Sequence, residues 1–286
     1  MSQKVIDSHF HIWDLKNDYP WLKNLKSFSL NSNYQISDYI ADFSEINVIK
    51  TVHIQAEITK EKRVYETQWL QDIADQNDQG FPNAIIGYVD FSDDKIEEDL
   101  ERHCQYKNFR GIRQILKTKI NDNTDLLINS KWFKNLELLN KFNLSFDLLI
   151  MFHQFDKAFN VIKKYPNTLF IINHCLWPEG TEKNLHDWKK ALKKISTLDN
   201  VVIKISGFGE WLVPCNVENI KGYVLEAIDN FGINRCMFGS NFPVDKHFSK
   251  KSFKFFWNSY FEITKKLSQN EKNKIFFLNA ERYYNI

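Results

Sequence analysis

The chain has 286 residues, of which 43% are hydrophobic and 26% charged, and it contains 24 Phe and 8 Trp. This composition excludes a disordered chain and supplies enough apolar side chains for a large core. The 38 basic and 36 acidic residues leave a formal net charge of +2, which argues against electrostatic capture of nucleic acid or of an anionic membrane. We therefore expect a small-molecule partner.

The four cysteines are widely spaced and form no C-x-x-C pair, so neither a disulfide scaffold nor a zinc ribbon is indicated. The chain opens with Met1-Ser2-Gln3-Lys4 and lacks the apolar run expected of a signal peptide, and no apolar run approaches about 18 residues. A cytoplasmic location with reduced thiols is therefore expected. None of these features fixes the oligomeric state, and a homodimer stays open.

Eight short apolar runs predict strands, and they cover residues 5–10, 49–54, 84–89, 109–116, 145–150, 168–172, 201–205 and 235–238. Segments with apolar residues three and four apart lie between them and predict amphipathic helices at 63–77, 93–104, 130–143, 156–165, 185–198 and 217–231. Alternation of helices with strands that are apolar on both faces indicates parallel pairing with right-handed crossovers.

This pattern predicts the α/β class and a closed (β/α)8 TIM barrel formed by one domain, residues 1–286. An open Rossmann-like sheet is the alternative, but no G-x-G-x-x-G follows any predicted strand. The segment 14–37 is too long for an ordinary strand-to-helix connection, and we expect it to cover a site. Its aromatic residues Tyr19 and Trp21, together with Trp177, either wall a pocket or pack the lid against the barrel.

The first predicted strand ends in a His-x-His pair, His9 and His11. Because side chains alternate along a strand, Asp7, His9 and His11 should share one face, and two imidazoles could bind one cation. The structural alternative is that both histidines line a polar cavity or hydrogen-bond to the backbone.

Further polar residues lie at the ends of later predicted strands, where barrel enzymes assemble their sites. They are Gln55, Arg110, Arg113, His153, His174, Lys204 and Asn241. His53 lies within an apolar run and is expected in the core, whereas His103, His186 and His247 are expected at the surface. His153 either follows the fifth strand as a site residue or begins the next helix. Arg110 and Lys204 could equally form structural ion pairs.

Several motifs occur in an order that resembles the amidohydrolase superfamily, in the branch that includes sugar-lactone hydrolases and 2-pyrone-4,6-dicarboxylate lactonase. They are Ile6-Asp7-Ser8-His9-Phe10-His11-Ile12-Trp13, Phe109-Arg110-Gly111-Ile112-Arg113, Asn173-His174-Cys175-Leu176-Trp177-Pro178, Lys204-Ile205-Ser206-Gly207 and Phe238-Gly239-Ser240-Asn241-Phe242-Pro243-Val244-Asp245. The end of the chain, residues 277–284, is similar to the closing motif of this branch.

The resemblance implies residue roles. His9, His11 and His174 would bind a divalent metal, zinc or manganese, and His174 would also act in catalysis. Arg113 or Lys204 would bind a substrate carboxylate or carbonyl oxygen. The remaining predicted substrate-binding residues are Trp21, Gln55, His153 and Trp177.

One position departs from the superfamily pattern, because Asn241 stands where an Asp usually binds metal and accepts a proton from water. A neutral amide cannot serve as a general base. Three interpretations stay open: the Asn241 carbonyl oxygen ligates or hydrogen-bonds water while His174 acts as the base; Asp245 moves in; or catalysis has been lost.

The sequence therefore predicts a hydrolase that opens a small cyclic ester, a sugar-acid or carboxylated lactone, at a histidine-lined barrel mouth. The alternatives are a decarboxylase of the same branch and a catalytically silent barrel that binds a metabolite.

Overall fold

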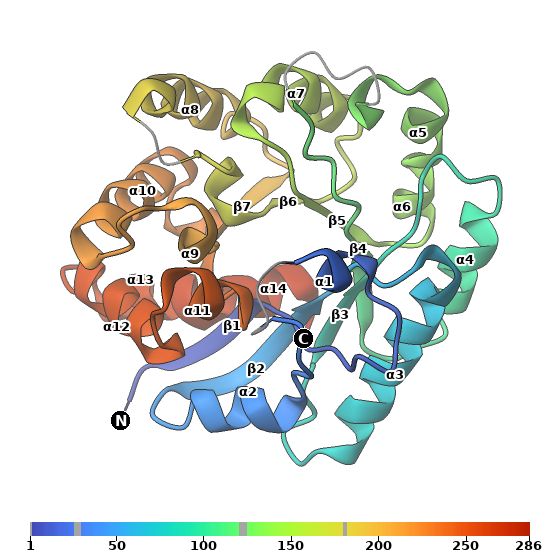
Figure 1. Ribbon diagram of the computed structural model, residues 1–286. Coiled ribbons are helices and arrows are strands. Elements are labelled where there is room, and N and C mark those ends of the chain that lie inside the picture. Colours follow the sequence, from blue (N-terminus) through green and yellow to red (C-terminus); the bar gives the residue numbers. More distant parts are fainter. Residues whose placement is uncertain (1, 26–29, 120–124, 180–181) are drawn as a thin grey trace.

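The computed structural model describes residues 2–25, 30–119, 125–179 and 182–286 (Figure 1). Eight strands form one parallel sheet in the order β1 to β8, which confirms the predicted (β/α)8 barrel. The strands are β1 (Lys4–Phe10), β2 (Asn47–Ile54), β3 (Ala84–Gly87), β4 (Phe109–Ile112), β5 (Ser145–Leu148), β6 (Phe170–Ile172), β7 (Val201–Ile205) and β8 (Cys236–Phe238).

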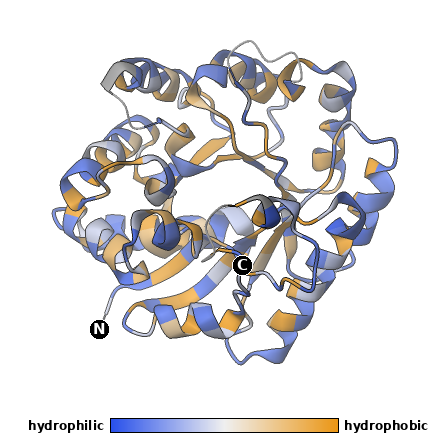
Figure 2. Ribbon diagram, viewed as in Figure 1, coloured by the Kyte–Doolittle hydropathy of each residue, from blue (hydrophilic) through white to orange (hydrophobic). Residues whose placement is uncertain are grey.

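Helices surround the sheet, and Figure 2 shows hydrophobic residues concentrated along the strands while the helices alternate between hydrophobic and hydrophilic residues. They are α1 (Pro20–Asn24), α2 (Ile36–Asp42), α3 (Arg63–Gln76), α4 (Ile96–His103), α5 (Ser130–Asn135), α6 (Glu137–Lys141), α7 (Phe155–Lys164), α8 (Glu182–Ile195), α9 (Phe208–Trp211), α10 (Val217–Phe231), α11 (Val244–Ser249), α12 (Phe253–Ile263), α13 (Gln269–Asn273) and α14 (Asn279–Tyr284). Within the described ranges, no helix combines the length and the apolar character that crossing a membrane requires.

The helix predicted over 130–143 is two short helices, α5 and α6, that meet at Leu136. Leu136 N donates to Phe133 O at 3.2 Å and Leu139 N donates to Leu136 O at 3.1 Å. These bonds span three residues and tighten the chain at the buried Leu136, which interrupts the regular α-helical pattern. The predicted covering segment 14–37 contains the short helix α1. Residues 26–29 of this segment lie outside the described residues.

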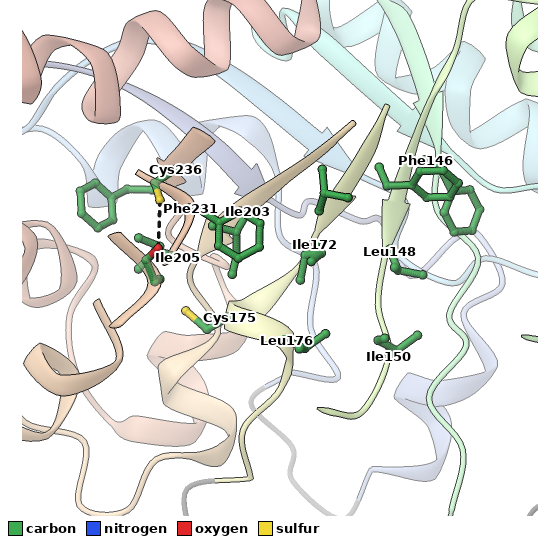
Figure 3. Close-up of a cluster of buried hydrophobic side chains, with 14 of the residues drawn as sticks. Phe146, Leu148, Ile150, Ile172, Cys175, Leu176, Ile203, Ile205, Phe231 and Cys236 are labelled. Carbon is green, nitrogen blue, oxygen red and sulfur yellow. Dashed lines mark hydrogen bonds between the residues drawn. The ribbon is translucent and has the colours of Figure 1, made fainter. Parts of the chain in front are cut away.

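Most strands contribute apolar residues to two separate cores, one on each face of the sheet. On β7, for example, Val201, Ile203 and Ile205 pack with the surrounding helices, whereas Val202 belongs to a cluster inside the barrel. Figure 3 shows the outer core between β5, β6, β7 and β8 and the nearby helix α10, with Phe146, Ile172, Ile203 and Phe231 all fully or almost fully buried. This double burial explains why the strand sequences are apolar on both faces.

The inner core is closed by the C-terminal helix α14. Its residues Ala280 and Tyr284 pack among inward side chains of the strands, which are Ile6, Val52, Ile54, Ala84, Ile86, Ile171, Val202 and Met237. The barrel interior is therefore a packed core and not a pore.

The barrel closes where the segment after β8 meets the end of β1. Asn241 N donates to His9 O at 2.8 Å, and His11 N donates to Phe242 O at 2.7 Å. The Ser240 amide and hydroxyl donate to the carboxylate of Asp7, at 2.9 and 2.6 Å. This seam fixes the two ends of the sheet side by side.

A buried ion pair lies among the inward-facing residues. Lys204 Nζ contacts Asp147 Oδ1 at 2.5 Å, and both side chains have 0% exposure. The hydroxyl of Tyr284 and the amide of Asn173 also donate to Asp147. Burial lowers the pKa of Lys204 to about 8, although the neighbouring Asp147 carboxylate opposes that shift.

We expect Lys204→Met to lower the free energy of unfolding by about 3–5 kcal/mol, because it leaves the Asp147 carboxylate buried without its counterion. Urea denaturation followed by circular dichroism measures this change. The matched control is Lys189→Met, which removes the exposed ion pair with Glu226 and should cost no more than about 1 kcal/mol. Equal effects of the two substitutions would contradict a stabilising role for the buried pair.

Candidate active site

A cavity of about 230 Å³ lies at the carboxyl end of the barrel. Groups of four chemical kinds line it: the imidazoles of His11 and His174, the cations of Arg113 and Lys117, the carboxylates of Glu57 and Glu210, and the amide of Asn241. The indoles of Trp21 and Trp177 form part of its wall. Because these residues follow different strands, the cavity has the location expected of a barrel active site.

The two residues of the His-x-His pair lie side by side, with His11 on the cavity wall and His9 fully buried and outside the lining residues. His9 Nε2 lies 3.2 Å from His11 Nε2, and His11 Nδ1 lies 2.6 Å from the carbonyl oxygen of Ile54. That carbonyl can only accept, so His11 carries its proton on Nδ1 and its Nε2 lone pair faces His9. His9 Nδ1 is buried without a hydrogen-bond partner.

Asp7 does not share this face, contrary to the prediction. The pairing register of β1 against β2 shifts between Asp7 and Phe10, so strict alternation fails there. Asp7 instead accepts hydrogen bonds from Tyr39 of α2 and from Ser240. Burial raises the pKa of Asp7 to about 6, although these hydrogen bonds oppose the shift.

His174 lies beside the pair, with its ring centroid 4.4 Å from that of His9. Its Nδ1 is 3.0 Å from the hydroxyl of Ser206, which follows β7. Gly207 makes room for this ring: a Cβ at position 207 would lie 2.5 Å from His174 Nδ1, and its φ of +81° disfavours any other residue.

All three imidazoles are held neutral. Burial is the main cause that lowers the pKa of His9, His11 and His174 well below the usual range. For His11 and His174 the next cause is the nearby Arg113 guanidinium. Neutral imidazoles suit both metal binding and proton acceptance.

The three histidines His9, His11 and His174 meet some of the requirements of a metal site and not others. Two nitrogens bound at about 2.0–2.1 Å to one tetrahedral ion lie about 3.3 Å apart, which is close to the separation of the His9 and His11 nitrogens. His11 and His174 each have the second hydrogen bond that commonly orients a ligand histidine, whereas His9 lacks one. Over the described residues, no three side chains of His, Cys, Asp or Glu are arranged to share an ion.

Arg113 presents its charge to the cavity from a buried position, with 4% exposure. Its Nη2 donates to the carbonyl oxygen of Gln55 at 2.5 Å, while its Nε has no hydrogen-bond partner. Desolvation lowers the pKa of Arg113, and Glu57 is the leading group that opposes this shift. A buried guanidinium with unused donors is suited to bind a carbonyl or carboxylate oxygen.

The aromatic wall is fixed by polar contacts. Trp21 Nε1 donates to the carbonyl oxygen of Ala56 at 2.7 Å, and Lys117 Nζ lies 3.6 Å from the centre of the Trp177 ring. Trp21 and Trp177 line the cavity, whereas Tyr19 is packed at 1% exposure. The substrate-binding role of the two indoles stays a prediction.

Asn241 connects two carboxylates. Its Nδ2 donates to Asp245 Oδ1 at 2.8 Å and to Glu210 Oε1 at 3.0 Å. Asp245, on α11, is fully buried and is not part of the cavity wall, whereas Glu210, on α9, lines the cavity. Burial raises the pKa of both acids, and that of Asp245 is raised further by the nearby Glu210.

Three other predicted site residues lie outside this cavity. Lys204 is in the buried ion pair with Asp147. His153 lies within the short helical turn Phe152–Gln154 before α7, and its Nε2 lies 3.1 Å from Thr118 O. Gln55 lines a neighbouring cleft of about 430 Å³ and accepts a hydrogen bond from the Glu57 amide. Their roles toward a substrate stay predictions.

Two histidines expected at the surface are buried, so that expectation was wrong. His103 has 0% exposure because Thr67 Oγ1 lies 2.8 Å from its Nδ1 and its ring stacks on Phe109. His247 is 8% exposed on α11. His186 is exposed, as expected, and His53 is in the core, where its Nε2 accepts from the Ile12 amide.

The sequence analysis missed Glu57, Lys117 and Glu210. Each lies in a loop or short helix beyond a strand end, where no periodic pattern marks which way a side chain points. The one available signal was the pair of glycines in Ser206-Gly207-Phe208-Gly209-Glu210, because closely spaced glycines after a strand indicate a tight approach of backbone to its surroundings.

Comparison with known proteins agrees with the fold and the motifs. A family model described as Amidohydrolase matches residues 6–286. An uncharacterized protein of Sinorhizobium fredii is 36% identical, covering 99% of this chain and 98% of its own length. An L-fucono-1,5-lactonase of Burkholderia ambifaria is 23% identical, covering 98% and 95%.

A solved structure of an amidohydrolase from Burkholderia multivorans with bound zinc has a TM-score of 0.85 and 21% identity, and covers 99% of both chains. That likeness shows a shared fold. The family model, which matches nearly the whole chain, confirms the resemblance found in the motifs, and the chain belongs to the amidohydrolase family.

Proposed function

We propose that this protein hydrolyses a small cyclic ester, most simply the lactone of a sugar acid. The observation that carries the proposal is the cavity itself: neutral imidazoles, a buried guanidinium and a carboxylate converge on a space of about 230 Å³ at the barrel mouth. The similarity to an L-fucono-1,5-lactonase over nearly the whole chain supports the same reaction class.

The charges on the wall favour an uncharged sugar lactone over a dicarboxylate. Two cations, Arg113 and Lys117, are matched by two carboxylic acids, Glu57 and Glu210, so the cavity has no excess positive charge to hold two carboxylates. Carboxylates and amides can accept and donate hydrogen bonds to sugar hydroxyls, and the indoles of Trp21 and Trp177 offer apolar surface to the sugar ring.

The residues of the cavity suit the polarisation of an ester carbonyl. Arg113 is buried and its Nε has no hydrogen-bond partner, so its interaction with a developing oxyanion is little screened by water. His174 is oriented by the Ser206 hydroxyl, and its Nε2 makes no hydrogen bond within the described part of the chain. That nitrogen is therefore available to bind a metal ion or, without one, to hold the water or the substrate oxygen.

We also propose that a divalent ion, zinc or manganese, binds to His9, His11 and His174. When bound, such an ion would polarise the carbonyl or lower the pKa of a bound water toward about 7. The spacing of the His9 and His11 nitrogens supports the first two ligands, and the zinc in the related Burkholderia multivorans structure supports the choice of metal.

We expect the wild-type protein to hydrolyse L-fucono-1,5-lactone and His174→Ala to lower kcat/KM by about 10²–10⁴-fold, because the substitution removes the imidazole from the cavity. A pH-indicator assay of acid release measures both. His186→Ala, which changes an exposed histidine on α8, is the matched control and should retain full activity. A wild-type protein that binds lactones without opening them would instead indicate a silent binding barrel.

We expect about one zinc or manganese ion per purified wild-type chain and a loss of that metal in His9→Ala, because His9 supplies one of the two nitrogens that face each other. Elemental analysis of protein from metal-supplemented medium measures the content, and His186→Ala should keep the wild-type value. Absence of metal from the wild-type protein would refute the metal and leave the lactonase reaction to the side chains alone.

A further inference from the structure

The site contains a carboxylate that the family pattern does not place there. Asn241 occupies the strand-eight position where the resemblance leads one to expect the Asp that accepts a proton from water. Its Nδ2 points instead at two carboxylates, Glu210 at 3.0 Å and Asp245 at 2.8 Å. Of these two acids, only Glu210 lines the cavity.

We propose that Glu210 is the general base of this enzyme, and that the catalytic carboxylate has moved from the end of β8 to the short helix after β7. This inference rests on the proposed lactone hydrolysis. It differs from each of the three interpretations of Asn241 that the sequence allowed, because it gives the proton to a residue outside the recognised motifs.

A general base at Glu210 also explains why residue 241 is an Asn and not an Asp. An Asp at position 241 would place a third carboxylate within hydrogen-bonding distance of Glu210 and Asp245, and like charges in a buried site repel strongly. An amide at the same place is neutral and donates a hydrogen bond to each acid. An amide at position 241 therefore stabilises an ionised Glu210, whereas a carboxylate there would repel it.

The local backbone explains how Glu210 reaches the cavity. A Cβ on Gly209 would lie 2.3 Å from the Asp245 carbonyl oxygen, so only glycine lets α9 approach α11 this closely. Gly207, with φ of +81°, turns the chain out of β7 directly before α9. The two glycines together place the next side chain, Glu210, against Asn241.

The charges around Glu210 suit proton acceptance. Burial raises its pKa, while Lys117, the Asn241 amide and Arg113 oppose that shift and favour the ionised form. The pKa of Asp245 is raised well above its usual range, and the proximity of Glu210 is one of the causes. Glu210 thus shares the cavity wall with two cations, Lys117 and Arg113, whereas Asp245 is fully buried and outside the wall.

The reaction step balances without any further reactant. The ionised Glu210 takes a proton from water as the water oxygen bonds to the lactone carbonyl carbon, and the carbonyl π electrons move onto its oxygen. When the carbonyl re-forms, the bond from that carbon to the ring oxygen breaks, and the proton on Glu210 passes to the ring oxygen. The product is the open hydroxy acid, and Glu210 is ionised again.

The test compares kcat/KM for L-fucono-1,5-lactone in the wild type, Glu210→Gln, and the double variant Glu210→Gln with Asn241→Asp. Glu210→Gln keeps the size of the side chain and should lower kcat/KM by about 10²–10⁴-fold. The double variant has a carboxylate at position 241 and an amide at position 210. Its kcat/KM should be at least about tenfold higher than that of Glu210→Gln. Glu218→Gln, on the exposed side of α10, is the control for the substitution itself.

Circular dichroism and urea denaturation show whether each variant is folded. A Glu210→Gln protein within about threefold of the wild type overturns the inference but leaves lactone hydrolysis intact. A large loss in Glu210→Gln that the folded double variant does not relieve also overturns it, because a carboxylate is then not what the site lacks. A wild-type protein that opens no lactone overturns the proposed function, and this inference with it.

Discussion

The site depends on the closure of the barrel between its first and last strands. Asn241 N bonds to His9 O and His11 N bonds to Phe242 O, so residues some 230 positions apart share one short seam. The Asp7 carboxylate holds the same seam through Ser240. Because the backbone at His9, His11 and Asn241 is fixed by these bonds, their side chains keep one mutual arrangement, which precise chemistry at a barrel mouth requires.

The fold could be predicted because parallel strands buried on both faces leave a plain pattern in the sequence. The apolar residues Val201, Ile203 and Ile205 serve the outer core while Val202 serves the inner one, so the run reads as continuously apolar. The prediction failed where local bonds overrode the periodicity. At Leu136 two bonds of three-residue span interrupt a helix, and at Asp7 a register shift turns a carboxylate away from the histidines.

The site was predictable only where a motif sets a residue at a strand end, as for His11, Arg113, His174 and Asn241. Glu210 and Lys117 reach the cavity from segments beyond the strands, and their direction depends on backbone turns that no periodicity encodes. Burial of a polar residue is equally hard to foresee. His103 is buried because Thr67, 36 positions away in the sequence, provides its hydrogen bond, and Lys204 because Asp147 provides a counterion.

The cluster of Glu210, Asn241 and Asp245 illustrates why a single changed motif residue is a weak sign of lost function. Judged by itself, an amide at position 241 removes a base. Judged by its contacts, it donates a hydrogen bond to each of two neighbouring acids, the fully buried Asp245 and the cavity-lining Glu210. Glu210 lines the cavity, and the cations of Lys117 and Arg113 together with the Asn241 amide favour its ionised form against the desolvation that raises its pKa. The amide at position 241 therefore does not leave the site without a carboxylate, because Gly207 and Gly209 let Glu210 approach Asn241 from the neighbouring helix α9.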